Sequence, residues 1–131
     1  MSKVGAAISK ILEDGTASVS PYPAYAEPET FDNTNEEYVT YRVRSIEPSD
    51  TKQGPSLLDH VEVDILIFGK SYLSAVSLSD KVRTDLDRVA YGTYNGVELN
   101  GVQFLSIDED YDPITERHEI EQSYRIRVKN P

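Results

Sequence analysis

Two histidines are the first residues of this chain that could carry out chemistry. His60 and His118 are the only histidines, and an imidazole can act as a general acid or base or as a metal ligand. Neither lies in a ligand-spaced cluster such as His-Glu-x-x-His. Both are therefore expected to be ordinary histidines of β-strands.

The densest group of carboxylates spans residues 108–112, which read Asp-Glu-Asp-Tyr-Asp. Hard cations such as Ca²⁺ and Mg²⁺ take carboxylate oxygens as ligands. The run lacks the glycine and the terminal glutamate that a calcium-binding loop needs at fixed offsets. Because Pro113 follows it, a solvated turn over residues 108–115 is the better prediction, and no metal site is expected.

Other catalytic signatures are missing from the sequence. It contains no phosphate-binding Gly-x-x-x-x-Gly-Lys loop, no Gly-x-Ser-x-Gly elbow and no Gly-x-Gly-x-x-Gly fingerprint. The absence of cysteine excludes disulfides, thiolate zinc sites and cysteine nucleophiles. The sequence thus predicts a protein without catalytic residues or cofactors. A small hydrolase built on the carboxylates of residues 108–112 and His118 is kept as an alternative.

Two segments have the periodicity of helices. Residues 3–14 place apolar side chains at helical spacing and are followed by Gly15, a natural helix stop. Ser71 can cap a second helix, whose apolar side chains recur at steps of three and four. This stripe consists of Ala75, Leu78, Val82, Leu86 and Val89.

Four segments alternate apolar and polar residues as β-strands do: 38–47, 61–67, 102–107 and 117–129. Asn95-Gly96 is a possible short turn before the third of them. The chain is therefore predicted to be one α+β domain, residues 1–131, in the order α-β-β-α-β-β. An antiparallel sheet with both helices packed on one face fits this order.

Two polar segments are too long for simple turns. Residues 16–37 contain Ser, Asn, acidic residues and three prolines, and residues 48–58 contain two prolines and a glycine. Each segment has too little apolar surface to offset the cost of ordering it, so both are expected to be mobile loops that become ordered on assembly.

Charge limits the partners. With a formal net charge of −10, the surface as a whole repels phosphate, so tight nucleic-acid binding is not expected. Such a surface either keeps the protein soluble or lets DNA pass without adhering. No apolar run is long enough to span a bilayer, and the N-terminus has no signal-peptide pattern, so no membrane association is expected.

Tyrosines are the predicted contact residues. The chain has nine of them against three phenylalanines, and tyrosine is enriched at protein interfaces. Those at positions 22, 25, 38 and 41 could anchor a neighbouring subunit or lie half-buried in the sheet.

Several of these pieces occur in a familiar order. Tyr-Val-Thr-Tyr-Arg-Val at residues 38–43 leads to a polar loop with Gly-Pro-Ser at 54–56 and to the alternating strand at 58–65. Phe-Gly-Lys-Ser-Tyr at 68–72, Leu-Ser-Asp-Lys-Val-Arg at 78–83 and Asp-Tyr-Asp-Pro-Ile-Thr at 110–115 follow, before a strand with Tyr124. Over about residues 20–128, the sequence resembles the tail completion or tail terminator proteins of long-tailed phages.

That resemblance implies a small α+β subunit of the virion, located in the tail or neck and assembled in the host cytoplasm. Such subunits form a ring, commonly a hexamer, on the head-proximal end of the tail tube. The ring ends tube polymerisation and contacts the head connector or a neck protein. The implied partners are other copies of the chain, the tail tube protein and the connector, while DNA passes through the ring without specific binding.

The assembly interface is predicted within the two long loops. Its apolar anchors would be Tyr22, Tyr25 and Leu57. Its polar rim would be Glu36, Glu37 and Lys52. The alternative function is a small acidic cytoplasmic binding module, an inhibitor or adaptor, that acts on a basic partner surface. A ring former self-associates, whereas such a module stays monomeric.

Overall fold

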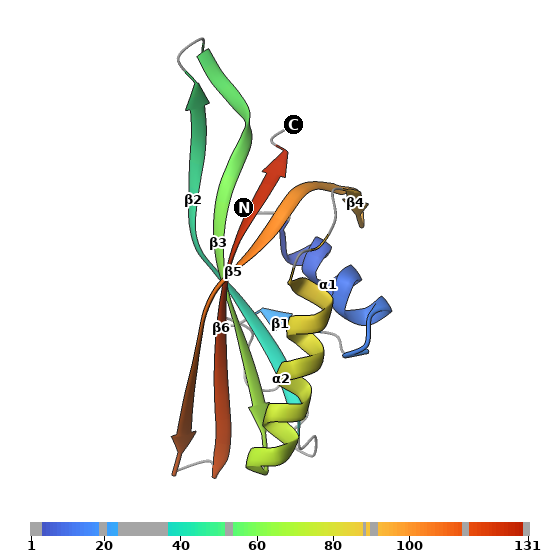
Figure 1. Ribbon diagram of the computed structural model, residues 1–131, viewed down its shortest axis with the longest axis vertical. Helices are drawn as coiled ribbons and strands as arrows, with labels where there is room; N and C mark the ends of the chain where they lie inside the picture. The colour runs from blue at the N-terminus through green and yellow to red at the C-terminus, as the bar shows by residue number, and fades with distance from the viewer. Residues whose placement is uncertain are drawn as a thin grey trace.

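A computed structural model describes residues 4–18, 21–23, 37–51, 54–87, 89, 92–113 and 116–129. It contains two helices and six strands (Figure 1). In chain order they are α1 (Val4–Asp14), β1 (Tyr22–Pro23), β2 (Glu37–Thr51), β3 (Gly54–Gly69), α2 (Tyr72–Leu86), β4 (Gly92–Tyr94), β5 (Val97–Asp112) and β6 (Arg117–Lys129).

All six strands belong to one sheet, in the spatial order β1-β2-β3-β6-β5-β4. Neighbouring strands are antiparallel, except that β1 runs parallel to β2. The α+β class is confirmed, with the short strands β1 and β4 added to the predicted order. β2 and β3 form an antiparallel hairpin, and the four long strands β2, β3, β6 and β5 make up most of the sheet.

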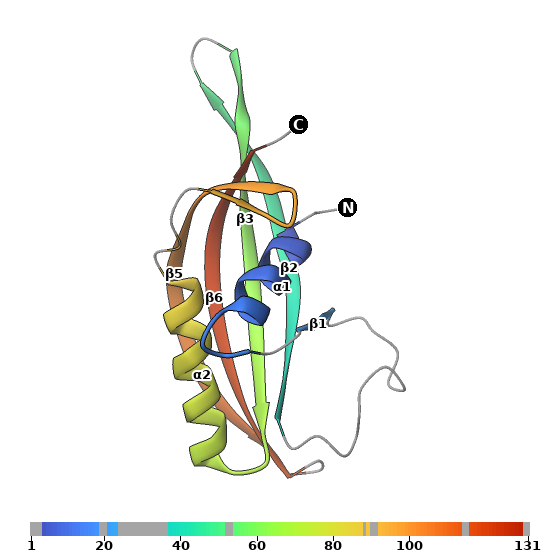
Figure 2. The same ribbon diagram turned by 90° about the vertical axis from the view of Figure 1, so that its right-hand side faces the viewer.

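Both helices cover the same face of the sheet, as predicted (Figures 1 and 2). The stripe on α2 points into the core, where Ala75, Leu78, Val82 and Leu86 are all buried. Opposite them lie alternate residues of the strands, such as Ile65 of β3. Removing a side chain of this size from water stabilises the fold by about 1.5–3 kcal/mol.

One polar side chain in the core has its hydrogen bonds satisfied. Gln122 of β6 is fully buried on the helix-covered face. Its Nε2 donates to the backbone oxygen of Ser79 at 2.9 Å and to Ser79 Oγ at 2.6 Å. Its Oε1 accepts from the hydroxyl of Tyr124, which is also buried. This network ties α2 to β6, because a buried amide without partners would be costly.

Short sequence signals fix the ends of these elements. Ser71 caps α2, with Ser71 Oγ accepting from the Ser74 amide at 3.1 Å in a capping box. Asn95 and Gly96 both have positive φ, 54° and 80°, which is the geometry of the two-residue turn that joins β4 to β5. At Gly69 an added Cβ would lie 2.8 Å from the backbone of Ala75, so glycine lets α2 turn back closely against β3.

The loop predicted over residues 48–58 is largely a hairpin. β2 continues to Thr51 and β3 begins at Gly54, with Pro48 opposite Asp59 and Asp50 opposite Pro55. β6 joins β3 only from Leu58 onward, so the end of the hairpin is a two-stranded ribbon that projects past the rest of the sheet (Figure 1). Pairing between the two strands overrides the turn preference of the prolines here, and a bulge between Pro48 and Asp50 accommodates them.

The prediction of a turn over residues 108–115 is also wrong for residues 108–112. Residues 108–112 extend β5 and pair with residues 117–121 of β6. Backbone pairing with β6 therefore outweighs the polar composition of the run. The third predicted strand, 102–107, accordingly becomes a strand from Val97 to Asp112.

Candidate assembly surface

The face of the sheet turned away from the helices, here called the outer face, is organised around Asp64. This side chain is buried, although strand β3 places it on the outer face. Its Oδ2 accepts from Arg42 Nη2 at 2.8 Å, and its Oδ1 accepts from Ser123 Oγ at 2.9 Å. Arg44 Nη1 lies 3.8 Å from the same carboxylate. Three neighbouring strands, β2, β3 and β6, are thus joined through one acid.

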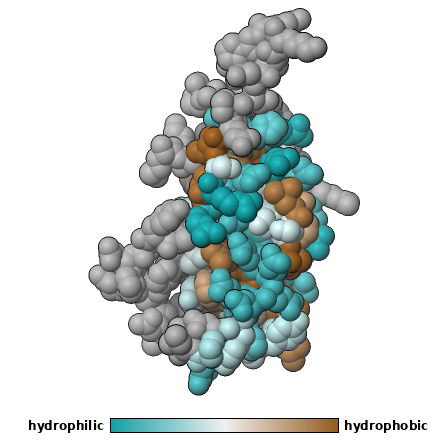
Figure 3. All heavy atoms as spheres, turned by 90° about the vertical axis from the view of Figure 1, so that its left-hand side faces the viewer, coloured by the Kyte–Doolittle hydropathy of each residue, from teal (hydrophilic) through white to brown (hydrophobic). Residues whose placement is uncertain are grey.

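Glu62, two residues before Asp64 on β3, also joins β3 to both of its neighbouring strands. Glu62 accepts from Arg44 Nη2 at 3.0 Å and from Arg125 Nη2 at 3.2 Å. Because all three side chains are partly exposed, the pairs contribute little to folding individually. Hydrophilic residues cover the centre of this face (Figure 3).

Two carboxyl groups of the outer face titrate differently. Burial alone would raise the pKa of Asp64, but hydrogen bonds from Arg42 and Ser123, with the charge of Arg44, outweigh it and hold the pKa below its ordinary value. At Glu121, burial and then the negative charge of Asp64 raise the pKa, although Arg42 opposes them. Arg42 Nη2 lies 3.8 Å from Glu121 Oε1, within ion-pair distance, but its effect on the pKa is smaller than those of burial and Asp64.

The β5–β6 side of the outer face places like charges directly opposite one another. Asp108 is the register partner of Glu121, and Asp110 is the partner of Glu119. Like charges in directly opposite cross-strand positions destabilise a sheet. These four residues are here called the acidic quartet. Its two aspartates come from the acidic run of residues 108–112, which is a strand rather than a turn, and its two glutamates come from β6.

Exposed apolar side chains gather where α2 begins beside β5. Tyr72 and Leu73 of α2 and Ile107 and Tyr111 of β5 are between 44% and 78% exposed. Tyr72 donates its hydroxyl to Glu109 at 3.1 Å, and this bond, with the Glu109 charge, raises the pKa of Tyr72. Exposed side chains of this size beside one another are typical of a contact surface.

His118 packs against two of these exposed side chains. Its ring packs against Tyr111, with centroids 4.7 Å apart, and against Tyr72, with centroids 5.7 Å apart. It also lies near the carboxylates of the acidic run, since Tyr111 is its register partner. The other histidine, His60, is on β3 opposite Arg127, so the two histidines do not meet.

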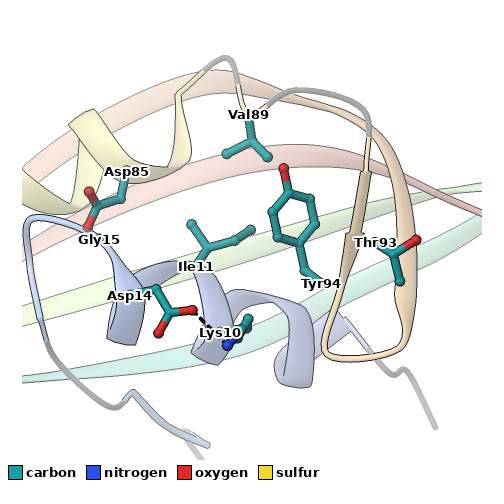
Figure 4. Close-up of a pocket in the computed structure, with 8 residues that line it drawn as sticks. All are labelled: Lys10, Ile11, Asp14, Gly15, Asp85, Val89, Thr93 and Tyr94. Carbon is teal, nitrogen blue, oxygen red and sulfur yellow. Dashed lines mark ion pairs between the residues drawn. The ribbon is translucent and has the colours of Figure 1, made fainter.

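An open hollow of about 510 Å³ lies between α1, the end of α2 and β4 (Figure 4). The side chains of Ile11, Val89 and Tyr94 point into it. Its charged residues already have partners: Lys10 pairs with Asp14 at 2.8 Å. Asp85 accepts from the backbone amides of Thr16 and Ala17 at 2.7 and 2.9 Å. These bonds hold the chain after α1 against α2, which is a structural role.

Across the described residues, no three or more His, Asp or Glu side chains converge as metal ligands. Neither of the two helices described has the length and apolar character needed to cross a membrane.

Among solved structures, the fold recurs in a virion. A chain in the structure of the virion of a native gene transfer agent (GTA) particle superimposes with a TM-score of 0.75 and is 16% identical in sequence. The match covers 97% of this chain and 95% of that chain. At this identity the similarity establishes a shared fold. No protein-family model and no curated protein sequence matches the chain.

Half of the six predicted interface residues lie outside the described part of the structure. Tyr25, Glu36 and Lys52 are not among the described residues. Tyr22 is in β1, where it pairs with Thr40 of β2. Glu37 begins β2 and is paired with Gly69, and Leu57 lies in β3. Their role as an interface, like the mobility of residues 16–37 and 48–58, stays a prediction.

The outer-face acids were not predicted as a group. The alternation in β2 and β6 does place Arg42, Arg44 and Glu121 away from the core, and that signal is visible in the sequence. The meeting of Asp64 with two arginines requires the register of β2 against β3, which no local pattern specifies.

Proposed function

We propose that the chain is a structural subunit of a phage-like particle, a tail terminator or tail-to-head joining subunit. In this role it forms a homo-oligomeric ring, commonly a hexamer, on the head-proximal end of the tail tube. The ring stops tube polymerisation and contacts the head connector or a neck protein. DNA passes through the ring without specific binding.

The observation that carries this proposal is the fold match to a chain of a GTA virion over nearly the whole of both chains. A shared fold does not by itself imply a shared function. The ordered resemblance of residues 20–128 to tail terminator proteins is independent of that match and points to the same kind of particle. The net charge of −10 suits a ring through which a polyanion slides.

Self-association and tube capping test the proposal. The purified chain is sized by light scattering and imaged by negative-stain electron microscopy. It is then added to the tail tube protein encoded in the same gene cluster. A ring former is expected to give a closed oligomer and to appear at one end of each tube, and added chain should shorten the tubes because it blocks further growth.

The result that would overturn the proposal is a chain that stays monomeric at high concentration and leaves the tube length unchanged. If such a monomer instead bound a basic protein in a salt-dependent way, the acidic binding module would become the better description. The acidic quartet is the surface that such a partner would be expected to contact.

A further inference from the structure

The sheet has two long edges without a strand neighbour in the part of the chain that the structure describes. On one side, β1 covers Thr40 and Tyr41, and β2 has no described strand neighbour over residues 43–51. On the other, β4 covers only Val97 to Leu99, which leaves β5 open over residues 100–112. Open edges present unpaired backbone donors and acceptors and readily accept another strand.

The two edges run in opposite directions. Each neighbouring pair among β2, β3, β6 and β5 is antiparallel, so β2 and β5, three steps apart, are antiparallel as well. A second copy in the same up-down orientation therefore brings its β2 edge antiparallel to the β5 edge of the first. The antiparallel sheet continues without a break across such a contact. The contact is heterologous, and heterologous contacts that close by rotation form rings.

The charges of the two edges are complementary. On the outer face, the β5 edge carries Asp108 and Asp110, which already face like charges on β6. On the same face, the β2 edge carries Arg42 and Arg44, whose side chains are 43% and 46% exposed although they pair with Asp64 and Glu62. Each arginine already lies within ion-pair distance of two carboxylates of its own chain, Arg42 of Asp64 and Glu121, and Arg44 of Glu62 and Asp64. An arginine has five N–H donors, so each guanidinium can still serve a further carboxylate.

We propose that copies of this chain join edge to edge, with β5 of one copy antiparallel to β2 of the next. Arg42 then lies opposite Asp110 of the neighbouring copy, and Arg44 lies opposite Asp108. This register aligns residues 42–44 of β2 with residues 108–110 of β5. Past Arg44, the bulges between Val43 and Ser45 in β2 and between Phe104 and Ser106 in β5 interrupt the alternation of faces. The register staggers neighbouring sheets along the strands, as closure of a sheet into a barrel requires.

A two-fold dimer is the competing arrangement. It would place β5 against β5, bringing aspartates opposite aspartates, or β2 against β2, bringing arginines together. Both are opposed by like-charge repulsion, whereas the mixed contact pairs opposite charges. The proposal rests on the self-association in the proposed function and specifies which surfaces make it.

Disulfide trapping tests this contact in a chain that has no cysteine of its own. The register places Val43 of one copy opposite Glu109 of the next, both on the helix-covered side. The double variant Val43→Cys/Glu109→Cys is oxidised and run on a non-reducing gel. Within one copy the two positions are separated by three strand spacings, about 14 Å, and cysteines whose Cα atoms are more than about 7 Å apart cannot be bridged. Every disulfide must therefore join two copies.

The expected result is a ladder of covalent dimers, trimers and larger species that ends at the closed ring. An equal mixture of the single variants V43C and E109C should stop at dimers. The pair Val43→Cys/Ile107→Cys, displaced by two residues, is the matched control and should trap far less. Circular dichroism and light scattering verify that each variant folds and self-associates.

Rings without a ladder from V43C/E109C would overturn the edge-to-edge contact and leave the proposed function standing. Dimers formed by E109C alone would overturn it in favour of the two-fold arrangement. A ladder from the displaced pair but not from V43C/E109C would refute the register. A chain that does not self-associate at all would remove both the proposed function and this contact.

Discussion

Neutralising the acidic quartet should have opposite effects on folding and on assembly. The change is Asp108→Asn together with Asp110→Asn, which keeps the side-chain shape and removes two charges. In the register of β5 and β6 these residues face Glu121 and Glu119. The double variant is expected to unfold less readily than the parent chain and to assemble less well.

The size of the folding effect follows from the two cross-strand pairs. Charged pairs in this position change stability by roughly 0.2–1 kcal/mol each, so relief of both gives about 0.5–2 kcal/mol. For a domain of this size, 1 kcal/mol corresponds to about 3–5 °C in the melting midpoint. Asp108 and Asp110 are exposed and Glu119 and Glu121 are half-buried, so the gain should shrink as salt screens the repulsion.

Urea unfolding at neutral pH and low salt measures the folding effect under conditions where the chain is monomeric. Asp80→Asn is the control, because Asp80 is equally exposed but lies on α2. Sedimentation at raised concentration measures assembly. A stability that falls in the double variant, or rises no more than in the control, would refute the account of the quartet. Unchanged assembly would argue against its place in the contact.

Three further predictions concern single residues. Leu86→Ala should lower the free energy of unfolding by about 2–5 kcal/mol, because the side chain is fully buried, and a loss no larger than that of exposed Leu73→Ala would contradict this. Asp64→Asn should cost about 1–3 kcal/mol at neutral pH, since it leaves Arg42 and Arg44 without their shared carboxylate. Because the folded pKa of Asp64 is lowered, this cost should be complete above about pH 3.9 and disappear as the pH falls through the folded pKa, which unfolding titrations of both proteins can test. Glu121→Gln should instead raise the free energy of unfolding at neutral pH, because the folded pKa of Glu121 is raised and the ionised carboxylate destabilises the fold. This gain should disappear below about pH 4.3, where Glu121 is protonated in both states. A gain independent of pH would exclude ionisation as the cause.

The elements with strong local signals could be read from the sequence. The apolar stripe of α2, the cap at Ser71 and the turn at Asn95-Gly96 are all where local patterns predict them. Each depends on residues only a few positions apart, so their side chains and backbone torsions decide the outcome before any distant contact forms. Alternation along β6 likewise separated the core side chains Ile120, Gln122, Tyr124 and Ile126 from the opposite face, although Ser123 of that face is buried as well.

The strand lengths could not be read in this way. Residues 48–58 and 108–112 contain prolines or acidic residues that favour turns, yet both segments are paired in the sheet. The partner strand supplies the backbone hydrogen bonds in each case. Strand propensity measures how well a residue fits its neighbours in a sheet, so it is weak information until those neighbours are known.

The candidate assembly surface was also only partly predictable from the sequence. The sequence by itself determined a cysteine-free, strongly acidic α+β chain, and it determined which side of residues 38–47, 61–67 and 117–129 carries charge. Only the tertiary structure decided that Asp108 and Asp110 face other acids and that Asp64 is shared between two arginines. It also decided that the acidic strand and the arginine-bearing strand form opposite edges of one sheet. The physical reason is that register and strand order arise from pairing between residues far apart in the chain, which local periodicity does not encode.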